Sequence, residues 1–105
     1  MTTTKLQIGE GAVGAFATLC RASAVHDLDL LAADAAKRSR FFAGRSRKLL
    51  RLLLEDPSLG RTIGEAIHDD AVSAAEWANE AVKRSVEADE ARIELENAEK
   101  DEANP

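Results

Sequence analysis

The chain has 105 residues, enough for one domain with a modest hydrophobic core. Its composition is 45% apolar and 31% charged, with two prolines and no tyrosine, which favours helix over sheet. The single cysteine, Cys20, excludes an internal disulfide and a cysteine-built zinc site, and it fits a reducing compartment. We expect Cys20 to be a small buried residue on a helix face.

The net charge of −5 conceals two halves of opposite sign. Residues 1–61 hold ten Lys and Arg against six Asp and Glu, whereas residues 62–105 hold four against thirteen. Opposite charges of this size attract, so each half is expected to contact the other half or a separate macromolecule.

The N-terminal region contains an apolar run, residues 11–20, that ends in cysteine and resembles a lipoprotein signal. However, Lys5 is the only basic residue before the run, and the bulky Leu19 precedes the cysteine. Ten residues are also too few to cross a bilayer. We therefore expect a cytoplasmic protein without a membrane span. Residues 1–9 are expected to form a flexible arm, with a short strand of the ribbon-helix-helix type as the alternative.

The apolar spacing predicts a first helix over residues 10–23 and a second helix that begins after Asp27 as N-cap and ends near Glu55. The apolar stripe of the first helix comprises Val13, Phe16, Ala17, Cys20 and Ala24. The stripe of the second comprises Leu28, Leu31, Ala32, Ala35, Phe42, Leu49 and Leu53.

Gly44 lies in the middle of the second helix and raises the question of a break. Leu31 and Leu49 lie on opposite sides of Gly44 in sequence, yet both fall within about 20° of the direction of Phe42 at roughly 100° per residue. A loop would not preserve that register, so a continuous helix through Gly44 is favoured. The alternative is a hairpin turn over residues 43–46.

A turn is predicted after this helix, because Pro57 forces Asp56 out of the helical region. Thr62 and Glu65 then have the spacing of a capping box. A long third helix is expected from about 62 to 98, which gives an all-α, three-helix domain spanning residues 1–105. Residues 99–105 are expected to be a flexible acidic tail.

One face of this long helix carries a row of mostly small residues at alternating steps of four and three, the spacing of a helix–helix contact. We expect this face, with Trp77 at its rim, to form the interface of a homodimer or of a complex with a protein partner. The row contains Ile67, Ala71, Ala74, Ala78, Ala81, Ser85, Ala88, Arg92 and Leu95.

A flanking row, Ala75, Val82, Val86 and Ile93, is expected to pack on the chain's own helices. The end of the long helix has a different character, because residues 87–102 hold eight acids against Arg92 and Lys100. We expect this acidic end, including Glu87, Glu90 and Glu94, to face solvent or a partner.

Residues 37–51 contain seven basic residues and no acid. In a continuous helix, five of them share one face opposite Phe42 and Leu49, and such a face could bind nucleic acid or another anion. The alternative is that these cations are solvated or pair with the acidic helix. The five are Lys37, Arg40, Arg47, Lys48 and Arg51.

No arrangement typical of catalysis is present, and no cofactor is expected. Glu65 and His68 have the Glu-x-x-His spacing of di-metal carboxylate bundles, but such sites need a second motif, and the other histidine is His26. We therefore predict no metal site. The sequence indicates a non-enzymatic helical interaction protein, such as an adaptor, assembly factor or inhibitor. The alternative is a nucleic-acid-binding regulator that uses the basic helix face.

Overall fold

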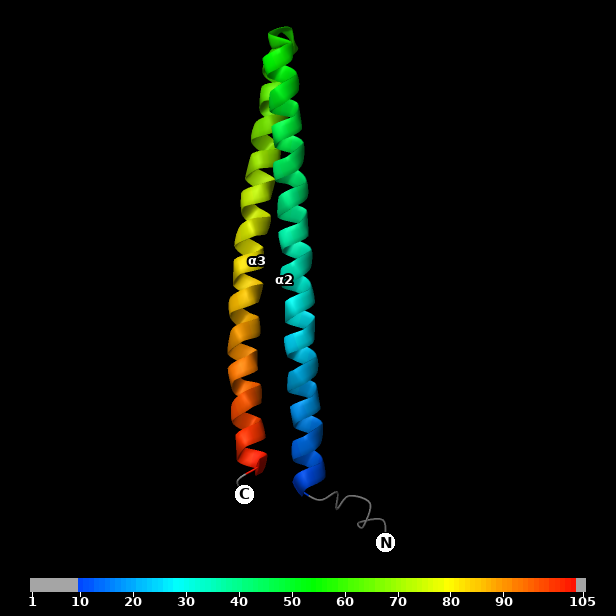
Figure 1. Ribbon diagram of the computed structural model, residues 1–105, viewed down its shortest axis with the longest axis vertical. Helices are drawn as coiled ribbons and strands as arrows, with labels where there is room; N and C mark the ends of the chain where they lie inside the picture. Colours follow the sequence, from blue (N-terminus) through cyan, green and yellow to red (C-terminus); the bar gives the residue numbers. More distant parts are fainter. Residues whose placement is uncertain (1–9, 104–105) are drawn as a thin grey trace. The chain divides into compact units, whose positions relative to one another are not determined.

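The computed structural model describes residues 10–103, with side chains from 14 to 101, so the expected arm at 1–9 lies outside the described residues. The fold is all-α: α2 (Glu10–Glu55) is followed by a short 3₁₀ turn, η1 (Pro57–Leu59), and by α3 (Gly60–Ala103). Within residues 30–84 the two helices form a helical hairpin (Figure 1). No helix within residues 10–103 has a stretch both long and apolar enough to cross a bilayer.

The prediction of three helices is wrong, because the first two are one continuous helix. Asp27 lies inside α2 and does not cap a new helix. Residues 23–27 contain neither glycine nor proline, so nothing interrupts the backbone hydrogen bonds there. Val25, in the expected break, is one of the few buried residues, and it continues the apolar spacing into Leu28.

The prediction that the helix continues through Gly44 is confirmed, and the alternative turn at 43–46 is wrong. Ala35 before Gly44 and Leu49 after it share one buried or partly buried face of α2, whereas Leu31, which also supported the prediction, is exposed. A break would place Ala35 and Leu49 on different sides of the chain.

The turn between the helices is built by Asp56 and Gly60. Helix α2 ends at Glu55 as expected, and a carboxylate oxygen of Asp56 accepts from the backbone N–H of Ser58 at 3.1 Å. Gly60 has φ 55 and ψ −137, a conformation that side chains disfavour, and its N–H donates to the Pro57 carbonyl. α3 begins at Gly60, so Thr62 lies inside the helix and the predicted capping box is wrong.

The far end of α3 also differs from expectation, since the helix continues through Ala103. The chain falls into two compact units that we describe separately. The turn unit comprises residues 30–84. The terminal unit comprises the described residues up to Asp29 and from Ser85 onward.

In the turn unit, α2 and α3 face each other through two rows at alternating steps of three and four residues. We call these the packed rows. Every member is buried or partly buried. The α2 row contains Ala32, Ala35, Ser39, Phe42, Ser46, Leu49 and Leu53, and the α3 row contains Ile63, Ile67, Asp70, Ala74, Trp77, Ala81 and Arg84. Leu31, which the sequence placed in the stripe, is exposed.

In the terminal unit, the buried residues are Val25 of α2 and Ala88 of α3. The stripe predicted for the first helix is wrong in phase, because Phe16 and Cys20 are exposed. Ala17 is partly buried as expected, whereas the side chain of Val13 lies outside the described residues.

The glycines of the turn region predict opposite effects of alanine. Gly60→Ala should lower the free energy of unfolding by about 1–3 kcal/mol, since alanine resists the positive φ. Gly64→Ala, the matched control inside α3 with open space around the added methyl, should raise it by about 1 kcal/mol. Urea denaturation followed by circular dichroism measures both. A shift of both variants in the same direction would contradict this account of the turn.

Candidate functional site

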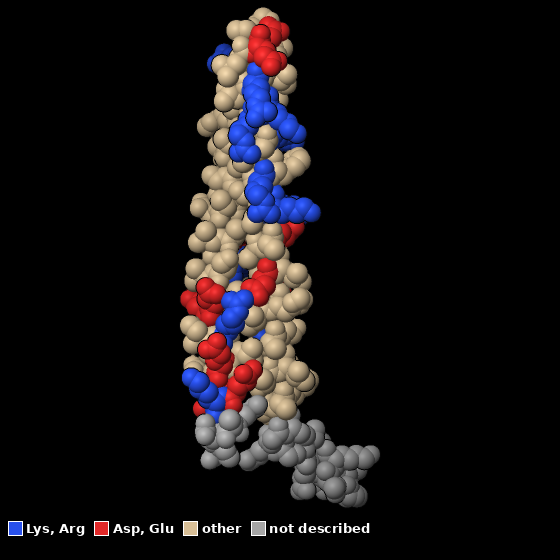
Figure 2. Space-filling view, in the orientation of Figure 1, with Lys and Arg blue, Asp and Glu red and all other residues tan. Residues whose placement is uncertain are grey.

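The basic face lies on α2 within the turn unit. Its five residues are exposed, and at roughly 100° per residue they fall in an arc of about 100°. None of the five forms an ion pair with a described residue. Figure 2 shows Lys and Arg side chains gathered along this part of the surface. The basic face consists of Lys37, Arg40, Arg47, Lys48 and Arg51.

The remaining two cations of the run, Arg38 and Arg45, are held by acids and aromatic rings. Arg38 pairs with Asp34 at 2.9 Å, and its guanidinium lies 4.9 Å from the centre of the Trp77 ring. Arg45 donates two hydrogen bonds of 2.7 Å to the carboxylate of Asp70 on α3. These two arginines therefore stabilise the contact between α2 and α3, whereas the residues of the basic face do not take part in it.

The serines that follow these arginines cross to α3 in the same way. The Ser39 hydroxyl donates to the Ala74 carbonyl at 2.8 Å, and the Ser46 hydroxyl donates to the Ile67 carbonyl at 3.1 Å. The repeated Arg-Ser-Arg sequence is thus a structural repeat of seven residues. In each copy the first arginine and the serine contact α3, and the second arginine faces solvent.

Asp70 was missed by the sequence analysis. It is the one charged residue that is buried among the described residues, at 6% exposed. Hydrogen bonds from Arg45, with its positive charge, lower the pKa of Asp70, and the same bonds raise the pKa of Arg45. The sequence signal that could have found Asp70 is its position, because it lies at the spacing of the α3 packed row between Ile67 and Ala74.

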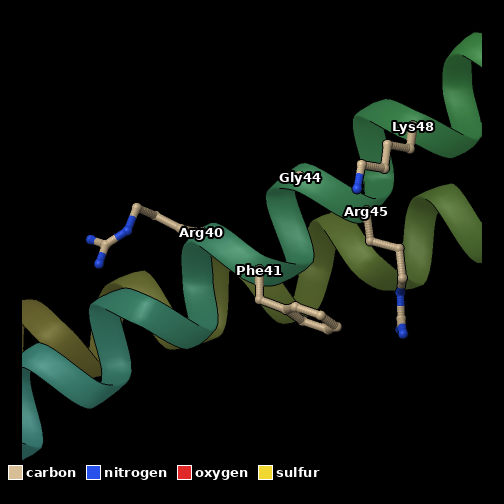
Figure 3. Close-up of a pocket in the computed structure, with 5 residues that line it drawn as sticks. All are labelled: Arg40, Phe41, Gly44, Arg45 and Lys48. Atoms are coloured by element: carbon tan, nitrogen blue, oxygen red, sulfur yellow. The ribbon is translucent and has the colours of Figure 1, made fainter.

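A hollow of about 450 Å³ opens on α2 beside the basic face, lined by Arg40, Phe41, Gly44, Arg45 and Lys48. Figure 3 shows the Lys48 amine turned back along the helix toward Gly44, with Arg40 extending the other way. The Phe41 ring meets Phe42 edge to face at 5.3 Å, and the Arg45 guanidinium lies 5.3 Å from its centre. An exposed aromatic ring therefore stands among cations, held in place by its neighbours.

The structure divides the predicted alanine row of α3. Ile67, Ala74 and Ala81 belong to the packed row and face α2 of the same chain. Ala71 and Ala78 are exposed, as is Ser85 in the terminal unit; there Ala88 is buried, and Arg92 and Leu95 are partly buried. Trp77 sits within the packed row and not at its rim.

The flanking row was assigned to the wrong side. Val82, Val86 and Ile93 are 65%, 50% and 58% exposed, and Ala75 is also exposed. Instead, α2 of the same chain covers part of the alanine row, namely Ile67, Ala74 and Ala81. The reason is a shift of the α2-facing surface by about one residue, which brings Asp70 and Trp77 inward in place of Ala71 and Ala78.

The acidic end of α3 belongs to the terminal unit. Glu90 and Glu94 are exposed, and Glu87 is partly buried. Arg92 crosses to Asp29 of α2 at 2.7 Å and also pairs with Asp89 at 2.8 Å. The pKa of Arg92 is raised, chiefly by its hydrogen bonds to Asp29. Arg92 was predicted to lie in an interface with a partner, whereas in the structure its ion pair with Asp29 joins α3 to α2.

Glu65 and His68 are both exposed, and Glu65 lies 3.6 Å from Arg61 in an ion pair one turn apart. Across residues 10–103, no group of three or more His, Cys, Asp or Glu side chains is placed to hold a metal ion. Comparison with protein-family models, curated proteins and solved structures gives no match for this chain.

The ion pair between the exposed Arg45 and the buried Asp70 predicts a defined pH dependence. Because the folded state lowers the pKa of Asp70, its stabilising effect is present above the ordinary carboxyl pKa of about 3.9 and is lost as the pH falls through the lower folded-state value. Asp70→Asn should therefore be less stable at neutral pH and should lose less stability on acidification than the wild type. Thermal melts between about pH 6 and pH 3 measure this.

The matched control is Asp69→Asn, at the exposed neighbour, which should leave both the melting temperature at neutral pH and its pH dependence close to wild type. If Asp70→Asn kept the full wild-type pH dependence, Arg45–Asp70 would not be the pair that titrates.

Proposed function

We propose that this chain is a non-enzymatic helical interaction protein that assembles with a second copy of itself. The observation that carries the proposal is how little apolar surface the chain buries alone. Among the described residues only Val25, Ala35 and Ala88 are buried apolar residues, whereas thirteen large apolar side chains are exposed. Exposed apolar surface on this scale is typical of a protein whose partner covers it.

The face available for this contact is a second row on α3, Ala71, Ala75, Ala78 and Val82, which we call the outer row. Its members are all exposed and follow steps of four, three and four residues, the spacing of a helix–helix contact. At roughly 100° per residue the outer row lies about 100° from the packed row. α3 therefore has two packing faces, and the chain supplies a helix for one of them.

A second copy is the occupant we infer, because the outer row is made of small side chains that suit its own image. In a two-fold interface the same patch meets itself, and alanines let two helices approach at the short end of the ~8–10 Å range. The exposed acids Glu90 and Glu94 remain available to a further, basic partner, which supports the adaptor, assembly-factor or inhibitor role expected from the sequence.

Ala71→Glu combined with Ala78→Glu should convert the dimer to a monomer, since two carboxylates would be buried without partners. Sedimentation equilibrium should give twice the chain mass of 11.3 kDa for the wild type and 11.3 kDa for the double variant, with helicity retained. Asn79→Glu is the matched control, because it places the same group on the next exposed position and should leave the dimer intact.

A second comparison separates this face from the hairpin contact. Ala74→Glu with Ala81→Glu introduces the same groups into the packed row and should reduce helicity and melting temperature. A wild-type mass of 11.3 kDa at micromolar concentration would rule out the homodimer, as would a double Ala71/Ala78 variant that keeps the dimer mass.

A further inference from the structure

The basic face concentrates positive charge that the rest of the turn unit leaves uncompensated. Its five cations lie within 15 residues, which is roughly 21 Å of helix at 1.5 Å per residue. Several are one turn apart, such as Arg47 and Arg51, and like charges at that spacing repel. Two acids of the turn unit, Asp34 and Asp70, form ion pairs with cations of α2. Their partners are Arg38 and Arg45, which do not belong to the basic face. An anion from outside the chain would relieve this repulsion.

Phe41 adds a second kind of contact at the same place. Its ring is 59% exposed although it is apolar, and it lies between Arg40 and Gly44 on the surface that the basic face shares. The ring is held by its T-shaped contact with Phe42 and by the Arg45 guanidinium, which Asp70 in turn fixes through two hydrogen bonds. The chain thus orients an aromatic ring toward solvent in advance of any ligand.

Gly44 keeps the space beside this ring open. It lies one turn from both Phe41 and Lys48, and a methyl group added there would meet only the end of the Arg47 side chain at 4.0 Å. The resulting hollow of about 450 Å³ has an aromatic wall and three cationic side chains around it (Figure 3). A planar group that carries phosphates fits such a site.

We infer that the basic face and Phe41 bind single-stranded nucleic acid. A base stacks on the exposed ring of Phe41 in the hollow at Gly44, and successive phosphates lie against the cations along α2. Proteins that bind single strands without sequence preference combine these two elements, a cationic track for the backbone and an aromatic platform for bases. No new covalent step is involved.

Other anionic macromolecules fit this face less well. An anionic membrane needs a continuous apolar strip between the cations. Between Lys37 and Arg51 the exposed large apolar side chains are Phe41 and Leu50, which lie on opposite sides of α2 at roughly 100° per residue and form no such strip. Cations alone are enough for sequence-independent binding to a duplex, but base readout in its grooves would rest on arginine and lysine, since this segment contains neither Asn nor Gln. A duplex also leaves its bases stacked, so Phe41 would have no partner.

Fluorescence anisotropy with a labelled single-stranded oligonucleotide of mixed sequence tests the inference on the wild-type chain. Five phosphate contacts give a slope of about −3.5 in log affinity against log salt, so affinity should fall roughly a hundredfold between 50 and 200 mM salt. The matching duplex should bind more weakly at each salt concentration. Absence of binding to the single strand at 50 mM salt would overturn the inference.

Two sets of variants separate charge from stacking. Arg40, Arg47 and Arg51 changed together to Gln should reduce the salt slope by about 2. The control changes Arg21, Arg61 and Lys83 to Gln, which alters the net charge equally at exposed positions outside the face and should keep the slope. An equal loss in both triple variants would show that only net charge matters and would overturn the site.

Phe41→Leu should weaken binding about 5- to 150-fold while the salt slope stays unchanged, because it removes one stacked base and no phosphate contact. Phe16→Leu, at an exposed phenylalanine of the terminal unit, is the matched control and should have no effect. Unchanged binding by Phe41→Leu would overturn the stacking contact. Binding to anionic lipid vesicles without binding to the oligonucleotide would assign the face to a membrane instead.

Discussion

The turn unit depends on a narrow contact between two rows that combine small, polar and larger apolar side chains, most of them only partly buried. Within residues 30–84, Ala35 is the one apolar residue that is buried, and the only other buried residue is Asp70. Alanine contributes little free energy of burial compared with leucine or phenylalanine. Polar contacts therefore carry much of the specificity between α2 and α3, above all the two hydrogen bonds from Arg45 to Asp70 and the two serine hydroxyls that donate to α3 carbonyls.

These polar contacts leave the register of the two helices partly undetermined. Because the Arg-Ser-Arg copies are seven residues apart, sliding one helix by seven would place Ser39 opposite Ile67 and Arg38 opposite Asp70. The same kinds of contact would then form again, at half their number. The turn removes this ambiguity, since Pro57 and the positive φ of Gly60 fix a short connection that cannot accommodate such a slide. The turn and the Arg-Ser-Arg repeat together define a single register between α2 and α3.

Part of the fold of α2 could be predicted from the sequence, and part could not. Composition was sufficient to predict an all-α chain, Pro57 to predict the end of α2, and apolar phase to predict the passage of α2 through Gly44. Apolar phase failed at residues 23–27, where Asp27 resembled a helix cap and the continuity of Val25 with Leu28 was overlooked. An aspartate at such a position stops a helix only if the backbone also turns, and no glycine or proline turns it there.

On α3 the error had a different origin. Alanine is apolar enough for either a buried or an exposed face, so a row of alanines does not reveal which of its edges meets the neighbouring helix. The side that meets α2 is marked by polar residues, Asp70 and Arg84, which an apolar search passes over. The partner of Asp70 is Arg45 on α2, so this contact could not be derived from α3 alone.

The placement of Ala71 and Ala78 outside the packed row has a consequence for assembly. A helix that contacts one neighbour needs one row at alternating steps of three and four, and α3 has two such rows about 100° apart. Two packing faces on one helix are the property of a bundle with at least three helices, whereas this hairpin supplies two. The basic face lies on α2 and shares no residue with the outer row of α3. A second copy on the outer row and a nucleic acid strand on the basic face would therefore use separate surfaces of the turn unit.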